Sequence, residues 1–192
     1  MACDFAATPG QLFRSHTDPV LFARWVGPDA MTTRIEHWDA RTGGSWRYVA
    51  VHDGVEYRFR GCFHEVRPDR IVQTFTFEGA PDGVALETLW FEDLGDGRTR
   101  LRTQSLVDSF EGRDAWLRSG METGVDEGYA KLDRMLAAPR TVSGRGSGGG
   151  VAGSLRRCAG GAGRSGDGAS GTRQPAHGPP SSGDRDRPVL HR

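Results

Sequence analysis

Polar and apolar residues alternate along the stretch from residue 43 to residue 77. Alternation with a period of two is typical of half-buried β-strands. The pair Asp53-Gly54 is a strong hairpin signal, and Pro68-Asp69 marks a second turn. The pattern therefore predicts three antiparallel strands, at residues 45–52, 55–66 and 71–77.

Almost every aromatic residue of these strands falls on one parity, so the sheet is predicted to have one face built of rings. A ring-lined face must be covered, either by a helix or by a ligand, because it would otherwise expose a large apolar area to water. With one residue from a later strand, the predicted inner face comprises Trp46, Tyr48, Tyr57, Phe59, Phe63, Phe75, Phe77 and Trp90.

Further strands are predicted on either side of this stretch. In the strand at 32–39, Ile35 and Trp38 are expected on opposite faces. In the strand at 84–93, one face carries Trp90 and the other carries Leu89 and Phe91. A last strand begins at residue 98, where arginines alternate with Thr and Leu. Six or so sequential strands with short turns indicate an antiparallel meander.

Helices are predicted at both ends of this meander. Thr8-Pro9 and Asp18-Pro19 each place an N-cap before a proline, which predicts two short consecutive helices. A long helix is predicted from about residue 114 to 137, because apolar residues recur there at helical spacing. Gly120, Gly124 and Gly128 lie beside that apolar arc, so they either let the helix approach the sheet closely or leave a space above it.

Composition divides the chain into two parts. Residues 1–138 are predicted to form one folded domain. Residues 139–192 are rich in Gly, Arg, Ser and Pro, lack aromatic residues and are predicted to be disordered. The arginines of this tail are scattered, so a nucleic-acid-binding arm is a weaker interpretation than a non-functional tail, such as a frameshift product.

Several function classes find little support in the sequence. The three cysteines and six histidines lack the spacing of a metal site, and no cofactor motif is present, so we expect neither a metal nor a cofactor. No apolar run is long enough to cross a membrane or to act as a secretion signal. These features favour a cytoplasmic protein, and the sequence leaves its oligomeric state open.

Candidate chemistry on the predicted inner face is sparse. Tyr48 or Tyr57 could polarise a carbonyl group, with Glu65 or His52 near the strand ends as a base. Each of these residues has a simpler structural interpretation, so no catalytic residue is assigned. His16 is interpreted as a residue that favours the C-terminal end of a short helix.

An ordered set of short motifs resembles a known family. The element order and the motifs resemble the START-like (SRPBCC, helix-grip) superfamily, and within it bacterial single-domain members of the branch named after the activator of the Hsp90 ATPase. These motifs together span residues 4–137. In chain order they are Phe13 with residues 16–19, Trp25 with residues 27–28, residues 41–46, residues 53–54, Gly61 with Phe63, residues 65–68, residues 97–100, and residues 120–124 with Leu132. The first strand is shorter than in the family, and the tail lies outside the family pattern.

The resemblance implies an α+β helix-grip fold, in which a curved antiparallel sheet wraps around a long C-terminal helix. It also implies a cavity between sheet and helix, lined by the eight aromatic residues above with Leu117, Met121 and Gly124 from the helix. The favoured function is binding of a hydrophobic small molecule without catalysis. The alternatives are a polyketide cyclase-like or hydrolase-like enzyme that uses a cavity Tyr with Glu or His, and an interaction protein of the Hsp90-activator type. A chaperone partner is less favoured, because the additional N-terminal domain of the eukaryotic co-chaperone is absent.

Overall fold

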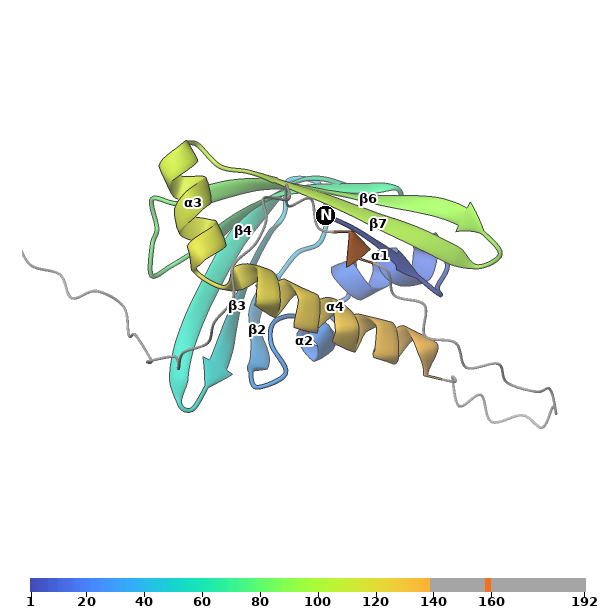
Figure 1. Ribbon diagram of the computed structural model, residues 1–192, viewed down its shortest axis with the longest axis horizontal. Helices are drawn as coiled ribbons and strands as arrows, with labels where there is room; N and C mark the ends of the chain where they lie inside the picture. The colour runs from blue at the N-terminus through green and yellow to red at the C-terminus, as the bar shows by residue number, and fades with distance from the viewer. Residues whose placement is uncertain (139–157, 160–192) are drawn as a thin grey trace, which may run out of the picture. The chain divides into compact units, whose positions relative to one another are not determined.

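Eight antiparallel strands form a single curved sheet in the computed structural model, which describes residues 1–138 and 158–159 (Figure 1). Along the sheet the strand order is β2-β3-β4-β5-β6-β7-β1-β8. The strands are β1 (Ala2–Phe5), β2 (Thr32–Trp38), β3 (Ser45–His52), β4 (Val55–Arg67), β5 (Arg70–Phe77), β6 (Val84–Gly95), β7 (Arg98–Leu106) and β8 (Cys158–Ala159). The predicted meander is confirmed from β2 to β7, and the short β1 pairs with β7.

Two short helices follow β1, as predicted: α1 (Pro9–Thr17) and α2 (Pro19–Trp25). Thr8 caps α1 through a reciprocal pair of hydrogen bonds with Gln11. The Asp18 side chain accepts hydrogen bonds from the first turn of α2, while its backbone N–H closes α1. One aspartate therefore ends one helix and begins the next. Figure 1 shows these helices on the side toward which the sheet curves, together with α4 (Met121–Ala137).

The predicted long C-terminal helix is in fact two helices, α3 (Phe110–Arg118) and α4. Gly120 separates them with a backbone φ of 76°, a left-handed conformation that glycine adopts without strain. The chain turns at this point, so the first predicted turn of the long helix belongs to a separate element. As a consequence Leu117 is 50% exposed, and its neighbour Trp116 contacts the sheet residue Phe75 instead.

The other two glycines of the predicted stripe bring α4 close to the loop after α2. A Cβ atom at Gly128 would lie 3.1 Å from the Trp25 carbonyl oxygen, and one at Gly124 would lie 3.3 Å from the Pro28 ring. These glycines therefore allow close approach, and the surface approached is the loop after α2, whereas the prediction placed it on the sheet.

The strand β6 presents the opposite face from the one predicted. Ala85, Leu89 and Phe91 are buried in the core, whereas Trp90 lies on the outer face with the Arg102 guanidinium 3.7 Å above its ring. A β-bulge corrects a second expectation, in β2. The register shifts between Ile35 and His37, so that Ile35 and Trp38 both pack against the core.

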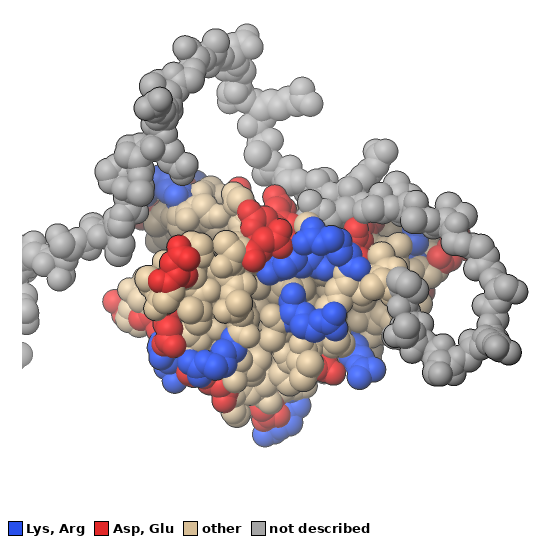
Figure 2. Space-filling view, turned by 90° about the horizontal axis from the view of Figure 1, so that it is seen from below, with Lys and Arg blue, Asp and Glu red and all other residues tan. Residues whose placement is uncertain are grey.

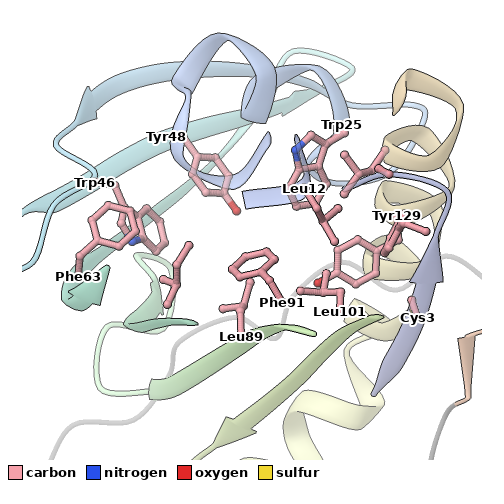
Figure 3. Close-up of a cluster of buried hydrophobic side chains, with 14 residues drawn as sticks. Cys3, Leu12, Trp25, Trp46, Tyr48, Phe63, Leu89, Phe91, Leu101 and Tyr129 are labelled. Carbon is pink, nitrogen blue, oxygen red and sulfur yellow. The ribbon is translucent and has the colours of Figure 1, made fainter. Parts of the chain in front are cut away.

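The hydrophobic core lies between the concave face of the sheet and the helices (Figure 3). Leu12, Phe63, Leu101 and Leu132 are at most 2% exposed. Gly61 is required on this face, because a Cβ atom there would lie 2.0 Å from the Thr74 carbonyl oxygen. The predicted division at residue 138 stays a prediction, since the tail lies outside the described residues except for the two residues of β8.

The outer face of the sheet is covered by paired charges, as the alternation of Arg and Glu indicates. Arg47 holds the Glu78 carboxylate in a bidentate pair at 2.8 and 2.7 Å, and it also contacts Glu36. Arg58 joins the same network through Glu36 and Glu56. Figure 2 likewise shows acidic and basic side chains next to one another on one face of the molecule. The arginines of this network are thus balanced by neighbouring carboxylates.

Candidate functional site

A pocket of about 540 Å³ lies between the concave face of strands β3–β6 and the helices α2 and α4. Its sheet side carries six of the predicted aromatic residues, Trp46, Tyr48, Tyr57, Phe59, Phe75 and Phe77. Met121 and Gly124 line it from α4. Most of the pocket wall is apolar.

Three of the predicted cavity residues lie elsewhere. Phe63 is 2% exposed and packs edge-on against Trp38, inside the filled part of the core. Trp90 lies on the outer face of β6, and Leu117 is on the exposed side of α3. In place of Leu117, α3 contributes Trp116 to the pocket.

The rings of the pocket wall support one another. Trp46 stacks on Tyr48 with ring centroids 5.5 Å apart, and Tyr48 stacks on Phe59 at 5.0 Å. Phe59 in turn packs against Phe75 at 5.4 Å. Because each ring is held by its neighbours, the wall is largely preformed, which reduces the entropy that would be lost when a ligand binds.

Glu87 is the carboxylate that the sheet places in this aromatic pocket, among the described residues that line it. Its Oε2 accepts a hydrogen bond of 3.0 Å from Gln73, its register neighbour on β5. On β7 the register neighbour is Ser105, which also hydrogen-bonds to it. Burial raises the pKa of Glu87, and these two hydrogen bonds only partly offset the rise. Gln73, Glu87 and Ser105 thus form a polar row across three strands.

Two tyrosine hydroxyls are close enough to sense the Glu87 charge. Burial raises the pKa of Tyr48 and Tyr129, and the Glu87 carboxylate raises both further. In Figure 3 the Tyr48 hydroxyl points away from the sheet, into the space between Trp46 and Trp25. Both hydroxyls remain protonated at neutral pH and can donate hydrogen bonds.

His16 lies in the last turn of α1, as interpreted from the sequence, and its side chain is buried in the pocket wall. Its ring lies 4.8 Å from Trp25 and 5.3 Å from Phe91 between centroids, and burial lowers its pKa to about 4. Nδ1 lies 2.8 Å from the Leu12 carbonyl oxygen, which can only accept, so Nδ1 carries the proton. Nε2 is therefore an acceptor, and it has no hydrogen-bond partner.

Two further polar atoms of the pocket wall lack a partner. They are Trp46 Nε1 and Thr33 Oγ1, and together with His16 Nε2 they complete the set of buried, unpartnered side-chain polar atoms in the described part of the chain. Buried polar groups are nearly always hydrogen-bonded in folded proteins. All three atoms lie in the wall of one pocket, where they can hydrogen-bond to a bound molecule.

Of the polar candidates named from the sequence, Tyr48 and Tyr57 line the pocket, whereas His52 and Glu65 lie outside it. His52 is near the Ala30 carbonyl oxygen at 3.1 Å, and Glu65 pairs with Arg67 and Arg70. Glu87 was missed, although its alternation with Leu89 and Phe91 was visible. Placing that face of the strand inward would have found it.

With this geometry in view, comparison with known proteins places the chain in a family. Residues 6–137 match the family described as Activator of Hsp90 ATPase homolog 1-like protein. The chain belongs to this family. Among curated proteins no match is found.

Solved structures of similar proteins share the fold of this Hsp90-activator-homologue family member. A protein from Rhodobacter sphaeroides is 28% identical, with a TM-score of 0.64, over 71% of this chain and 92% of its own. A protein from Arthrobacter aurescens is 27% identical, with a TM-score of 0.67, over 72% and 85%. The AHSA1 protein from Silicibacter pomeroyi is 23% identical, with a TM-score of 0.57, over 71% and 96%. The predicted helix-grip α+β fold is thus confirmed.

No helix within the described residues is both long and apolar enough to cross a membrane. The same residues contain no group of three or more His, Cys, Asp or Glu side chains placed to hold a metal ion.

Proposed function

We propose that the protein binds a hydrophobic small molecule in the pocket between the sheet and α4, without changing it chemically. The observation that carries the proposal is the preformed, ring-lined pocket of about 540 Å³. Ligand pockets have volumes of roughly 300–1,000 Å³ and combine an apolar wall with a few polar groups. Membership of a family with a binding-protein fold supports the same function.

The state of His16, Tyr48 and Tyr129 favours binding over catalysis by these three groups. A general acid or base works best when its pKa lies near the working pH. His16 is a weak base with a pKa of about 4. The pKa values of Tyr48 and Tyr129 are raised, so their hydroxyls are poorer acids and form very little phenolate at neutral pH. These groups are suited to orienting a ligand by hydrogen bonds.

Native mass spectrometry of the protein purified from its own host would test the proposal. We expect a bound molecule whose mass is lost under denaturing conditions, and a rise in melting temperature when lipid or polyketide compounds are added. If neither is observed, the binding proposal fails.

A variant that fills the pocket provides the matched test. Ala50 is buried on β3 and lines the pocket, so Ala50→Phe would occupy part of the space. We expect this variant to lose the bound molecule while keeping the circular dichroism spectrum of the wild type. Val55→Phe, at an exposed site on β4, is the control and should retain the molecule.

The description of the family names activation of the Hsp90 ATPase, which would be a surface function. Ala50→Phe and Val55→Phe distinguish this surface function from binding in the pocket. A surface function should survive Ala50→Phe, because that substitution changes only buried space.

A further inference from the structure

The charges around the pocket are all of one sign. Of the described residues that line it, two are carboxylates, Glu87 and Glu127, and none is Lys or Arg. His16, the one basic side chain in the wall, is neutral above a pKa of about 4. A cationic ligand therefore finds opposite charge in the lining, whereas an anionic ligand finds neutral donors but no positive charge.

The two carboxylates hold different positions. Glu127, on α4, is partly committed, since its Oε2 accepts the Asp29 backbone N–H at 3.0 Å. Glu87 lies on the sheet, where Gln73 and Ser105 fix its orientation. The Glu87 charge acts on the hydroxyls of Tyr48 and Tyr129 and raises their pKa values; both hydroxyls are donors and add no positive charge.

The aromatic wall adds to the same preference. The face of an aromatic ring attracts a cation, and the attraction is stronger where the contact is shielded from water. Trp46, Tyr48, Phe59 and Phe75 surround the space in front of the sheet. The rings and the Glu87 carboxylate together suit a ligand with an ammonium group attached to an apolar chain or ring.

We propose that the pocket selects an apolar amine, with Glu87 as the residue that binds its ammonium group. This inference rests on the proposed binding function and adds the chemical class of the ligand. A protonated amine would place a positive charge next to the buried Glu87 carboxylate and so stabilise its ionised form. A carboxylate ligand would instead be repelled by the negative charge of Glu87.

Three probes that share one decyl chain test the inference: decylamine, 1-decanol and decanoate. Binding to the full chain is measured at pH 7.5 by isothermal titration calorimetry, below the concentration at which the probes aggregate. A charge-assisted hydrogen bond is worth about 1.5–3 kcal/mol, so decylamine should bind at least about tenfold more tightly than 1-decanol. Decanoate should bind most weakly.

Glu87→Gln keeps the size of the side chain and removes its charge. In this variant the preference for decylamine over 1-decanol should fall to less than about twofold, while 1-decanol binding changes little. The control is Glu92→Gln, on the outer face of the same strand, where Glu92 pairs with Arg102. This control should keep the wild-type preference. Thermal unfolding of both variants verifies that they fold.

The outcomes separate the inference from the binding function itself. Equal binding of decylamine and 1-decanol by the wild-type protein, or tighter binding of decanoate, would overturn the amine inference and leave a hydrophobic pocket. If Glu87→Gln folds and keeps the preference, Glu87 is not the binding residue. If none of the three probes binds, both proposals fail. The order of the three affinities in the wild-type protein tests the amine inference even if Glu87→Gln does not fold.

Discussion

His16 illustrates how burial changes the chemistry of a single side chain. An exposed histidine is partly protonated near neutral pH, but here two aromatic rings and the helix exclude water from the imidazole. The Leu12 carbonyl fixes the proton on Nδ1, which leaves Nε2 as an acceptor inside the wall. The sequence shows only a His one helical turn after Leu12, and nothing in that spacing tells whether α1 turns this face toward the core.

The lowered pKa of His16 predicts a loss of stability in mild acid. The pKa falls from 6.5 to about 4 on folding, so between these values the unfolded chain binds the proton and the folded protein does not. The stability of the folded protein is therefore not reduced by His16 above pH 6.5, and it decreases as the pH falls toward 4. Between pH 6.5 and 5 the loss amounts to about 2 kcal/mol.

Urea unfolding of wild type and His16→Gln at pH 7.5, 6.5 and 5 measures this contribution. The Gln amide can still donate to the Leu12 carbonyl but does not titrate, so the stability advantage of the wild type should shrink over this range. Glu87 acts in the opposite direction, because its raised pKa favours folding at lower pH. Comparison of the two proteins removes that effect. An advantage that is constant with pH would contradict the prediction, and His37→Gln serves as an exposed control.

At the scale of elements, the sequence determined the helices and strands better than it determined their faces. Strand β6 carries apolar residues on both parities, with Leu86 and Trp90 on one and Leu89 and Phe91 on the other. Period alone cannot decide between them, because the choice depends on which face the helices cover. The aromatic parity of β4 was decisive because Glu56, Arg58 and Arg60 occupy its other parity.

The division of the C-terminal helix has a similar explanation. Apolar residues continue at helical spacing through Gly120, so periodicity predicts one helix. A left-handed glycine is also compatible with that spacing, and only the packing of Trp116 on Phe75 reveals the turn. Local patterns do not record such tertiary preferences.

The contact between α4 and the loop after α2 gives a second prediction. Lys131 Nζ donates to the Pro28 carbonyl oxygen at 3.0 Å and lies 3.5 Å from that of Val26. Lys131→Met should keep the packing of the stem but leave these acceptors without their partner. The free energy of unfolding should decrease by about 1–2 kcal/mol.

Arg134→Met, one turn further along α4, is the control. Arg134 and Asp29 form an ion pair in which both side chains are 63% exposed. Exposed pairs of this kind are worth less than about 1 kcal/mol, so this variant should be close to wild type in urea unfolding. Equal losses in the two variants would show that the Lys131 contacts with the loop carry no special weight.

At the scale of the whole molecule, the pocket is central enough for most of the tryptophans to report on it. Of the five tryptophans in the chain, Trp25, Trp38, Trp46 and Trp116 line the pocket, and Trp90 lies outside it. A probe in the pocket should therefore reduce quenching of tryptophan fluorescence by acrylamide. The reduction should persist in Trp90→Phe, which keeps a ring beneath Arg102.

Titration of wild type and Trp90→Phe with 1-decanol, at a fixed acrylamide concentration, provides the measurement. The relative protection should be larger in the variant, because its fluorescence comes only from pocket tryptophans. Loss of the response in Trp90→Phe would place the probe on the outer face of the sheet instead.

The turn at Gly120 also bears on how long a bound molecule would stay. Helix α3 has no buried residue, and its Trp116 covers one edge of the pocket. Segments with little buried surface open locally at a lower free energy than the rest of a fold. Release would then require only that α3 swing away at Gly120, with the sheet and α4 intact. Residence time and global stability would thus be set by different parts of the chain, and selection could change one without changing the other.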